Sequence, residues 1–227
     1  MTSQRPLTAA AITIAATLAL PAEADATEKG FPMTITATSA APAPSALQAP
    51  IDARAVVDFW RAAGPALWFA KDTEFDRRFR ERFLWLYLAA TRGELSDWPN
   101  TPEGALALVI LLDQFPRNSF RNTPRMYATD AMARKTADAA LKAGHDRAVE
   151  PALRLFFYLP LGHSESLADQ ERSVALNEAL GEPNLSHAKR HRDIIRRFGR
   201  FPHRNPILGR TMTPDEQRYL DEGGYAG

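Results

Sequence analysis

The chain has 227 residues, of which 45% are hydrophobic and 24% charged, and its formal net charge is +1. This length and composition suit one globular domain with a hydrophobic core. The balanced charge gives no general attraction toward nucleic acid or membrane surfaces. The sequence contains no cysteine, which excludes disulfides, thiol nucleophiles and zinc sites built on thiolates.

Residues 1–50 differ in composition from the rest of the chain. An apolar run over 7–20, rich in Ala and Thr, follows Arg5, and Ala24-Asp25-Ala26 has the small-x-small pattern of a cleavage site. This arrangement resembles a secretory signal, which implies a periplasmic or secreted protein; the run is too short for a membrane span. We favour an over-long gene start with Met33 as the true initiator. In both cases we predict a disordered extension over 1–50 and one helical domain over 51–227.

Helix signals then repeat to the end of the chain. The pattern predicts helices over 52–62, 72–92, 101–115, 129–142, 151–160 and 164–181, a long helix that begins at Asn184 or Ser186 and ends near 197, and a short final helix from 213. Their expected caps are Asp52, Asp72, Thr101, Thr129, Ser164 and Thr213, and their expected stops include Gly64-Pro65, Pro116 and Pro160. The result is an all-α bundle or superhelical stack of about seven to eight helices.

The apolar residues of these helices indicate where the core lies. Phe75, Phe79 and Phe83 recur at every fourth position and form one stripe. The segment over 105–112 is apolar on every face, which indicates a central buried helix. An aromatic stripe of this kind is typical of a core and not of a cofactor site.

A first break in the pattern is Asp113-Gln-Phe-Pro-Arg-Asn118. A carboxylate in the last turn of a helix faces the negative end of the helix dipole, which costs roughly 0.3–1 kcal/mol unless cations or donors offset it. Arg117, Arg121 and the Asn118 amide are the candidates. We interpret this group first as a buried Asp–Arg clamp that fixes the following loop, with a functional site as the alternative.

A second break is His163-Ser-Glu165 with Glu171. His163 stands beside a helix N-terminus, where free N–H groups attract anions. Glu171 projects with Leu167 and Val174 from an apolar stripe, so we expect it to need a partner.

The third break is the last long helix and the loop after it. His187 and His191 fall on its inward face, and a pair at this spacing is more often satisfied by hydrogen bonds than by a metal. Eight Lys and Arg residues stand against one acidic residue between positions 187 and 210. This excess of donors favours an anion site.

Three blocks of the chain resemble one bacterial family. They are Leu111-Leu-Asp-Gln-Phe-Pro-Arg-Asn118, Tyr158-Leu-Pro-Leu-Gly-His-Ser-Glu165 with Asp169-Gln-Glu171, and Arg197-Phe-Gly-Arg-Phe-Pro-His-Arg-Asn205 with Leu208-Gly-Arg210. They are similar to the signature blocks of domain of unknown function 924, over roughly 52–225. The resemblance implies an all-helical fold related to tetratricopeptide-like superhelices and a cytoplasmic location. It implies no reaction.

Because the family blocks coincide with the three pattern breaks, we expect their polar residues to meet in one pocket. The expected ligand-binding residues are Asp113, Gln114, Arg117, Asn118, His163, Glu165, Glu171, His191, His203, Arg204 and Asn205. No cofactor is indicated, and no catalytic residue can be assigned.

Three functions compete. The first is binding of an anionic small molecule or a peptide. The second is a hydrolase or phosphohydrolase that uses His163 or His203 as acid and base, or a metal held by His187 and His191 with Glu165 or Glu171. The third is a purely structural scaffold. RNA binding is disfavoured because no aromatic stacking platform accompanies the arginines. No P-loop, G-x-S-x-G, H-E-x-x-H or G-x-G-x-x-G motif is present.

Overall fold

The computed structural model describes residues 52–227, and the predictions for residues 1–50 lie outside the described residues. Within this range the chain forms helices and no β-strand, so the all-α prediction is confirmed for this part. The α-helices are α1 (Ala53–Trp68), α2 (Thr73–Thr91), α3 (Pro102–Val109), α4 (Phe115–Ser119), α5 (Asp130–Lys142), α6 (Leu155–Gly162), α7 (Leu167–Glu178), α8 (Asn184–Phe198) and α9 (Pro214–Asp221). None of them is long and apolar enough to cross a membrane.

Four of the predicted N-caps are present. Asp52, Asp72 and Thr101 accept hydrogen bonds from backbone N–H groups in the first turns of α1, α2 and α3. Thr213 and Glu216 form a reciprocal capping box at the start of α9. Each cap satisfies backbone N–H groups that the helix itself leaves unpaired.

Helix α1 continues past the stop expected at Gly64-Pro65. Gly64 adopts a φ of 67°, which kinks the helix, and Pro65 then begins a further turn that reaches Trp68. Proline is tolerated there because it occupies the first turn after the kink. The indole N–H of Trp68 donates to the Trp60 carbonyl at 2.7 Å, so the extra turn is tied to the first part of the helix.

The sequence predicts that a helix stops at Pro116. The structure differs, because the helical chain continues through this residue. A π-helical turn, η2 (Ile110–Gln114), joins α3 to α4, and the Phe115 N–H bonds to the Ile110 carbonyl. Thr129, predicted to cap α5, donates its hydroxyl to the Leu112 carbonyl at 2.6 Å instead. Because Pro116 lacks the N–H that would bond four residues back, Thr129 supplies the missing donor.

Two further boundaries differ from the prediction. Helix α6 passes through Pro160 and ends at Gly162, since burial of Phe156, Phe157 and other apolar side chains offsets the one hydrogen bond that proline removes. Ser164 does not cap α7, which begins at Leu167. The Ser164 hydroxyl donates to Asp169 at 2.7 Å and accepts from the Ser166 N–H at 3.2 Å, so it orders the turn that precedes the helix.

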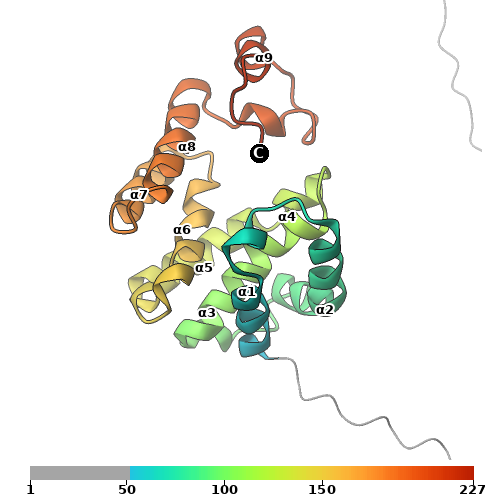
Figure 1. Ribbon diagram of the computed structural model, residues 1–227, viewed down its shortest axis with the longest axis vertical. Coiled ribbons are helices and arrows are strands. Elements are labelled where there is room, and N and C mark those ends of the chain that lie inside the picture. The colour runs from blue at the N-terminus through green and yellow to red at the C-terminus, as the bar shows by residue number, and fades with distance from the viewer. Residues whose placement is uncertain (1–51) are drawn as a thin grey trace, which may run out of the picture. The chain divides into compact units, whose positions relative to one another are not determined.

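The aromatic core lies among α1, α2 and α4. Phe75, Phe79 and Phe83 are almost completely buried, as predicted, and Phe79 stacks on Phe59 and meets Phe115 edge to face. In Figure 1, α1 to α4 group together, α7 and α8 lie side by side, and α5 and α6 lie between the two groups.

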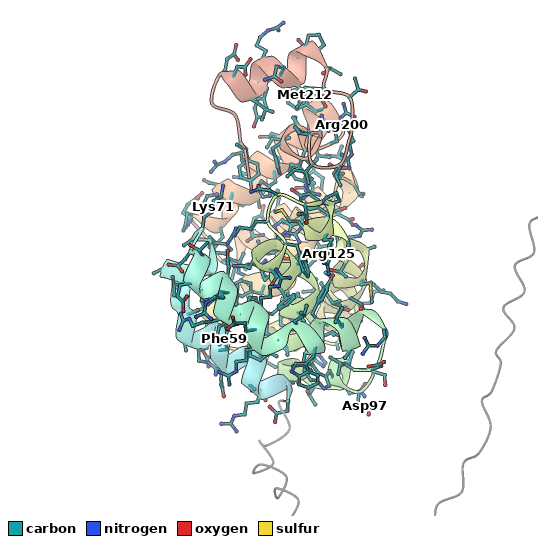
Figure 2. The ribbon with its side chains drawn as sticks, turned by 90° about the vertical axis from the view of Figure 1, so that its right-hand side faces the viewer. Phe59, Lys71, Asp97, Arg125, Arg200 and Met212 are labelled. Carbon is teal, nitrogen blue, oxygen red and sulfur yellow. The ribbon has the colours of Figure 1, made fainter. Side chains whose placement is uncertain are left out.

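The C-terminal part of the chain forms a separate end of the described region. Residues Phe201–Gly227 include the 3-10 helix η6 (Pro202–Arg204) and α9, which pack on each other. Figure 2 shows Arg200 and Met212 at this end and Phe59 and Asp97 at the opposite one, with Lys71 and Arg125 between them. The functional site described next lies where this C-terminal part meets the first helices.

Candidate functional site

The site is built around a contact between Asp113 and His163, residues that stand fifty positions apart in the chain. Asp113 Oδ1 lies 2.8 Å from His163 Nδ1, and the Asp113 side chain is 1% exposed. The π-turn η2 carries Asp113, and His163 is the first residue after α6. Such turns insert an extra residue into a helix and often occur at functional sites.

The charge of Asp113 is balanced by Arg117, one turn further along the same helix. The Arg117 guanidinium lies 3.3 Å from the carboxylate and donates to the Asp113 carbonyl at 2.7 Å. Burial alone would raise the pKa of Asp113, but Arg117 and His163 hold it below its ordinary value. The carboxylate is therefore ionised at neutral pH and orients the imidazole.

Two of the donors expected for Asp113 serve another carboxylate. The Asn118 amide donates to Asp76 of α2 at 2.7 Å, and Arg121 pairs with the same carboxylate at 3.0 Å. Since α2 and α4 pack against each other, Asp76 is nearer to both donors than Asp113 is. The predicted clamp is thus divided into two pairs, one facing His163 and one facing α2.

A second arginine joins the site from the C-terminal part. Arg204 donates to the His163 carbonyl at 2.9 Å and lies 3.6 Å from Asp130, which also pairs with Arg117 at 2.9 Å. The Arg204 guanidinium stacks over Tyr127, with 4.7 Å from its carbon to the ring centroid. Asp130 therefore links two arginines that come from distant parts of the sequence.

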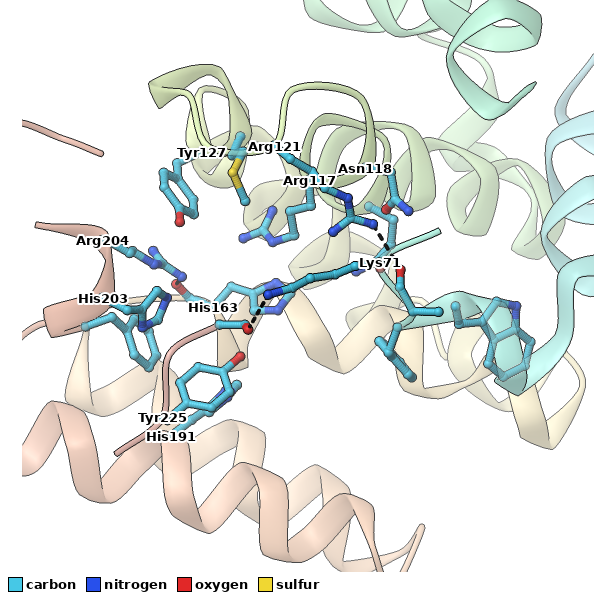
Figure 3. A pocket seen from close by; sticks show the side chains of 17 residues that line it. Lys71, Arg117, Asn118, Arg121, Tyr127, His163, His191, His203, Arg204 and Tyr225 are labelled. Atoms are coloured by element: carbon cyan, nitrogen blue, oxygen red, sulfur yellow. Dashed lines mark hydrogen bonds between the residues drawn. The ribbon is translucent and has the colours of Figure 1, made fainter. Parts of the chain in front are cut away.

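Arg117, His163 and Arg204 line a cavity of about 210 Å³. Figure 3 shows Arg117 and Arg121 approaching it from one side, Arg204 and His203 from another, and His191 and Tyr225 from a third. Lys71 reaches into the same space and lies 3.4 Å from the Gly227 carbonyl. Four cationic side chains line the cavity, Lys71, Arg117, Arg121 and Arg204, and its described lining includes no Asp or Glu side chain.

Several buried nitrogens at the site have no hydrogen-bond partner among the described residues. They are Arg117 Nη2, Arg204 Nε and His203 Nδ1. Buried donors normally have partners, and leaving one unpaired costs about 1–3 kcal/mol. Arg117 Nη2 and Arg204 Nε are donors in every protonation state, so they offer two N–H groups to a ligand, whereas His203 Nδ1 is a donor in only one tautomer. The buried acceptors Asp130 Oδ1 and Asn205 Oδ1 also have no hydrogen-bond partner among the described residues.

The three histidines of the cavity are held in the neutral form. Burial and the nearby charge of Arg117 lower the pKa of His163, although Asp113 opposes the shift. Burial and His163 lower the pKa of His191 to about 3, and burial and Arg204 lower the pKa of His203 to about 4. All three imidazoles are therefore uncharged at pH 7, and the lowered pKa values make His191 and His203 weak bases.

The cavity also lowers the pKa of one of its own arginines. Burial and the charge of Arg117 act in this direction on Arg204, and Asp130 opposes them. Because guanidinium pKa values start above 12, Arg204 stays charged. Mutual repulsion of this kind is what a bound anion would relieve.

Not all the predicted residues reach the cavity. Gln114, His163, His191, His203, Arg204, Arg117 and Asn118 line it. Glu165 does not, because it accepts hydrogen bonds from the Phe201 N–H and from Arg210, both at 2.9 Å, and so supports the loop that carries His203. Asn205 is completely buried beneath the site, with its amide 3.4 Å from the Met212 sulfur.

Glu171 lies outside the site, and its placement on an apolar stripe was wrong. It is exposed and pairs with Arg196 of α8 at 2.6 Å. Its stripe neighbour Leu167 is itself 43% exposed, because this side of α7 faces solvent and α8. Glu171 therefore joins two helices.

The alternative of a metal held by His187 and His191 gains no third ligand. His187 is exposed and lies 3.1 Å from Arg190, and His191 Nδ1 lies 3.2 Å from the Gly162 carbonyl. Over residues 52–227, no three His, Cys, Asp or Glu side chains are placed to hold a metal ion.

Sequence reasoning missed Lys71, Tyr127, Asp130 and Tyr225. Lys71 stands in the short turn between α1 and α2 and Tyr225 after α9, where nothing local marks a functional residue. Asp130 stands in the first turn of a helix, a position where an acid is common for reasons of the helix dipole. Only the tertiary contacts give these residues a shared place.

Over residues 52–227, the fold and the site define an all-helical domain with a small, basic, histidine-rich cavity. The chain belongs to the family described as "Bacterial protein of unknown function (DUF924)", whose model matches residues 56–224. The structure of a protein of unknown function, ATU0120 from Agrobacterium tumefaciens, is similar: it is 56% identical, with a TM-score of 0.74, covering 75% of this chain and 97% of that one. No curated protein matches the chain.

Proposed function

We propose that the protein binds an anionic small molecule in the cavity between Lys71, Arg117 and Arg204. The observation that carries this proposal is the lining: four cationic side chains and no carboxylate side chain among the described residues. The nitrogens of Arg117 and Arg204 that have no partner supply the donors. Carboxylates and phosphates are the groups that guanidinium donors recognise best.

The two arginines are preorganised for such a ligand. Asp130 and the His163 carbonyl hold the Arg204 side chain, and Asp113 holds that of Arg117. A side chain already held in place loses little further rotamer freedom when it binds, which favours affinity. The fixed positions of the guanidinium groups thus favour a small anion of defined geometry.

The test is anion binding by two variants with matched charge loss. Lys71→Gln removes an exposed charge at the cavity, whereas Lys135→Gln removes an exposed charge on α5 that lines no described cavity. With phosphate, sulfate and acetate as probes, we expect Lys71→Gln to weaken binding about two- to fivefold and Lys135→Gln to leave it unchanged. Isothermal titration calorimetry measures this.

A thermal-shift screen gives a second readout. A ligand at a hundred times its dissociation constant stabilises the folded protein by roughly 2.7 kcal/mol. The binding proposal fails if no phosphate, carboxylate or acidic peptide shifts the melting temperature and calorimetry detects no heat of binding. Preference for an acidic peptide over small anions would favour the peptide form of the proposal instead.

The successive packing of α5 on α6, α6 on α7 and α7 on α8 supports a relationship to tetratricopeptide-like stacks. Such stacks bind extended peptides, so this relationship is what makes the peptide form worth testing. A cytoplasmic location is also part of our proposal and follows from the resemblance to the family.

A second function, hydrolysis, is favoured by the pairing of Asp113 with His163. The carboxylate fixes Nδ1, so Nε2 is the atom that could take a proton from water, with Arg117 and Arg204 beside it to stabilise negative charge. Assays with p-nitrophenyl phosphate and p-nitrophenyl acetate test this. Activity that disappears in His163→Gln, while phosphate binding persists, would establish it; equal rates in both proteins would exclude it.

A further inference from the structure

A second, larger cavity adjoins the basic one. It has a volume of about 810 Å³ and lies between the end of α1, helix α6 and the facing parts of α7 and α8. The two cavities share a wall of six residues: Trp68, Phe69, His163, His191, Tyr225 and Gly227. Its volume falls in the range of roughly 300–1,000 Å³ that is usual for small-molecule sites, whereas the basic cavity is below it.

The larger cavity is mainly apolar. Leu155 and Leu159 line it from α6, Leu180 and Ala188 from the α7–α8 side, and Pro65 and Phe69 from the end of α1. Arg154 is its one Lys or Arg among the described lining residues, and Arg154 donates to the Asp146 carbonyl at 3.0 Å. The two adjoining cavities therefore differ in chemistry, one cationic and small, the other apolar and large.

The exposed aromatic ring of Phe69 marks where the two cavities meet the surface. Its side chain is 59% exposed and lines both of them. A large apolar group left in water at the mouth of an apolar cavity is a common feature of binding sites for apolar ligands. Tyr225 adds an amphipathic ring at the same boundary, tilted against His191 with 4.7 Å between the ring centroids.

We propose that the ligand is a fatty carboxylate, with its carboxylate at Lys71, Arg117 and Arg204 and its single alkyl chain in the apolar cavity. This inference rests on the proposed anion binding and names the ligand class of the same site. The small volume of the basic cavity suits a compact headgroup, and the adjoining cavity gives an alkyl chain a place out of water. Neutral His163 and His191 at the shared wall keep charge away from the chain.

The test is the dependence of affinity on chain length. The whole protein is titrated by calorimetry with a series of straight-chain carboxylates from acetate to dodecanoate, each below its micelle concentration. Each buried methylene is expected to raise affinity by up to about fourfold, until the cavity is full. Dodecanol, which has the chain without the charge, is expected to bind far more weakly than dodecanoate. Dodecyl phosphate tests whether the headgroup must be a carboxylate.

Two variants are designed to block the apolar cavity. Ala152→Trp and Ala179→Trp replace exposed alanines that line the apolar cavity, and Ala131→Trp is the matched control on α5, which lines no described cavity. Both blocking variants are expected to remove the dependence on chain length and to bind acetate as the parent protein does. The control is expected to behave as the parent. The melting temperature of each variant confirms that it is folded.

The outcomes separate the inference from the function on which it rests. If phosphate and acetate bind, and Lys71→Gln weakens them, but affinity does not rise with chain length, the inference is wrong and anion binding stands. If dodecanoate and dodecanol bind equally and Lys71→Gln has no effect, both are wrong. If the blocking variants keep the full dependence on chain length, the chain lies elsewhere and the inference is also wrong.

Discussion

The aromatic core among α1, α2 and α4 and the polar site around His163 are held together in opposite ways. The core uses a periodic stripe from one helix, and its rings pack mainly against one another, with Arg82 over the outer face of Phe83. The site uses single residues from separate segments, joined by ion pairs and directed hydrogen bonds. Apolar packing tolerates changes of pH, whereas a network of buried charges depends on every partner and on protonation.

The largest effect is expected from opening the core. Phe79 is fully buried and contacts five other aromatic rings, so Phe79→Ala is expected to lower the free energy of unfolding by about 4 kcal/mol. Urea denaturation measures this. Leu88→Ala, on the same helix but 38% exposed, is the control and is expected to cost less than about 1 kcal/mol. Similar costs for the two variants would contradict the assignment of Phe79 to the core.

The next largest effect is expected from the buried carboxylate of the site. Asp113→Asn removes the more deeply buried of the two carboxylates that pair with Arg117 and leaves Asp130 as its counter-charge, which is expected to cost about 3 kcal/mol. The matched control is Asp138→Asn, whose pair with Arg172 is largely exposed and is worth about 1 kcal/mol or less. If Asp113→Asn lowers the free energy of unfolding no more than the control does, the pair with Arg117 does not stabilise the fold.

Lowering the pH is expected to reduce the contribution of the site to the free energy of unfolding and to leave the contribution of the aromatic core unchanged. Because burial lowers the pKa of His191 to about 3 and of His203 to about 4, the unfolded chain takes up protons first as pH falls. Their contribution is present above about pH 6.5 and is lost toward the folded pKa, by up to about 2 kcal/mol for each histidine between pH 7 and 5. Urea denaturation at the two pH values measures the loss.

Two variants serve as controls for the acid effect. His191→Asn is expected to show a smaller loss between pH 7 and 5 than the parent protein, because it removes one of the groups that titrate. His187→Asn removes an exposed histidine and is expected to leave the loss unchanged. A protein equally stable at both pH values would show that the histidines are not kept neutral by the fold.

The smallest effect on stability is expected at the π-helical turn η2, which connects α3 to α4. Thr129→Val removes the hydroxyl that bonds the Leu112 carbonyl, and a buried acceptor without a partner costs about 1–2 kcal/mol. Thr91→Val, which removes an exposed hydroxyl bonded to Leu88, is the control with an expected cost below about 0.5 kcal/mol. Equal thermal shifts for the two variants would mean that Thr129 does not support the π-turn.

Local patterns fixed most of the helices and the core. Each of the caps at Asp52, Asp72, Thr101 and Thr213 accepts a hydrogen bond from a backbone N–H three residues later, so the neighbouring residues are enough to predict it. The same holds for the Phe75–Phe83 stripe, whose spacing alone places it on one face. Family membership likewise follows from contiguous blocks of sequence, and the match over residues 56–224 confirms it.

Local patterns were misleading wherever a distant residue supplied what the sequence lacked. Pro116 ends a helix in isolation, yet here Thr129 satisfies the freed carbonyl from the far side of a loop. Asn118 and Arg121 stand beside Asp113 in sequence, but α2 brings Asp76 closer to them. Such choices depend on packing between helices, which a single stretch of chain does not encode.

By itself, the sequence determined an all-helical domain and the three polar blocks from which a site could be made. Periodicity and capping depend on residues that are close together in the chain, so they can be recognised in the sequence alone. Only the tertiary structure decided that Asp113 contacts His163, that Asp130 joins two arginines, and that Glu171 faces away. Burial sets both the charge of a histidine and the strength of an ion pair, and burial exists only once the helices have packed.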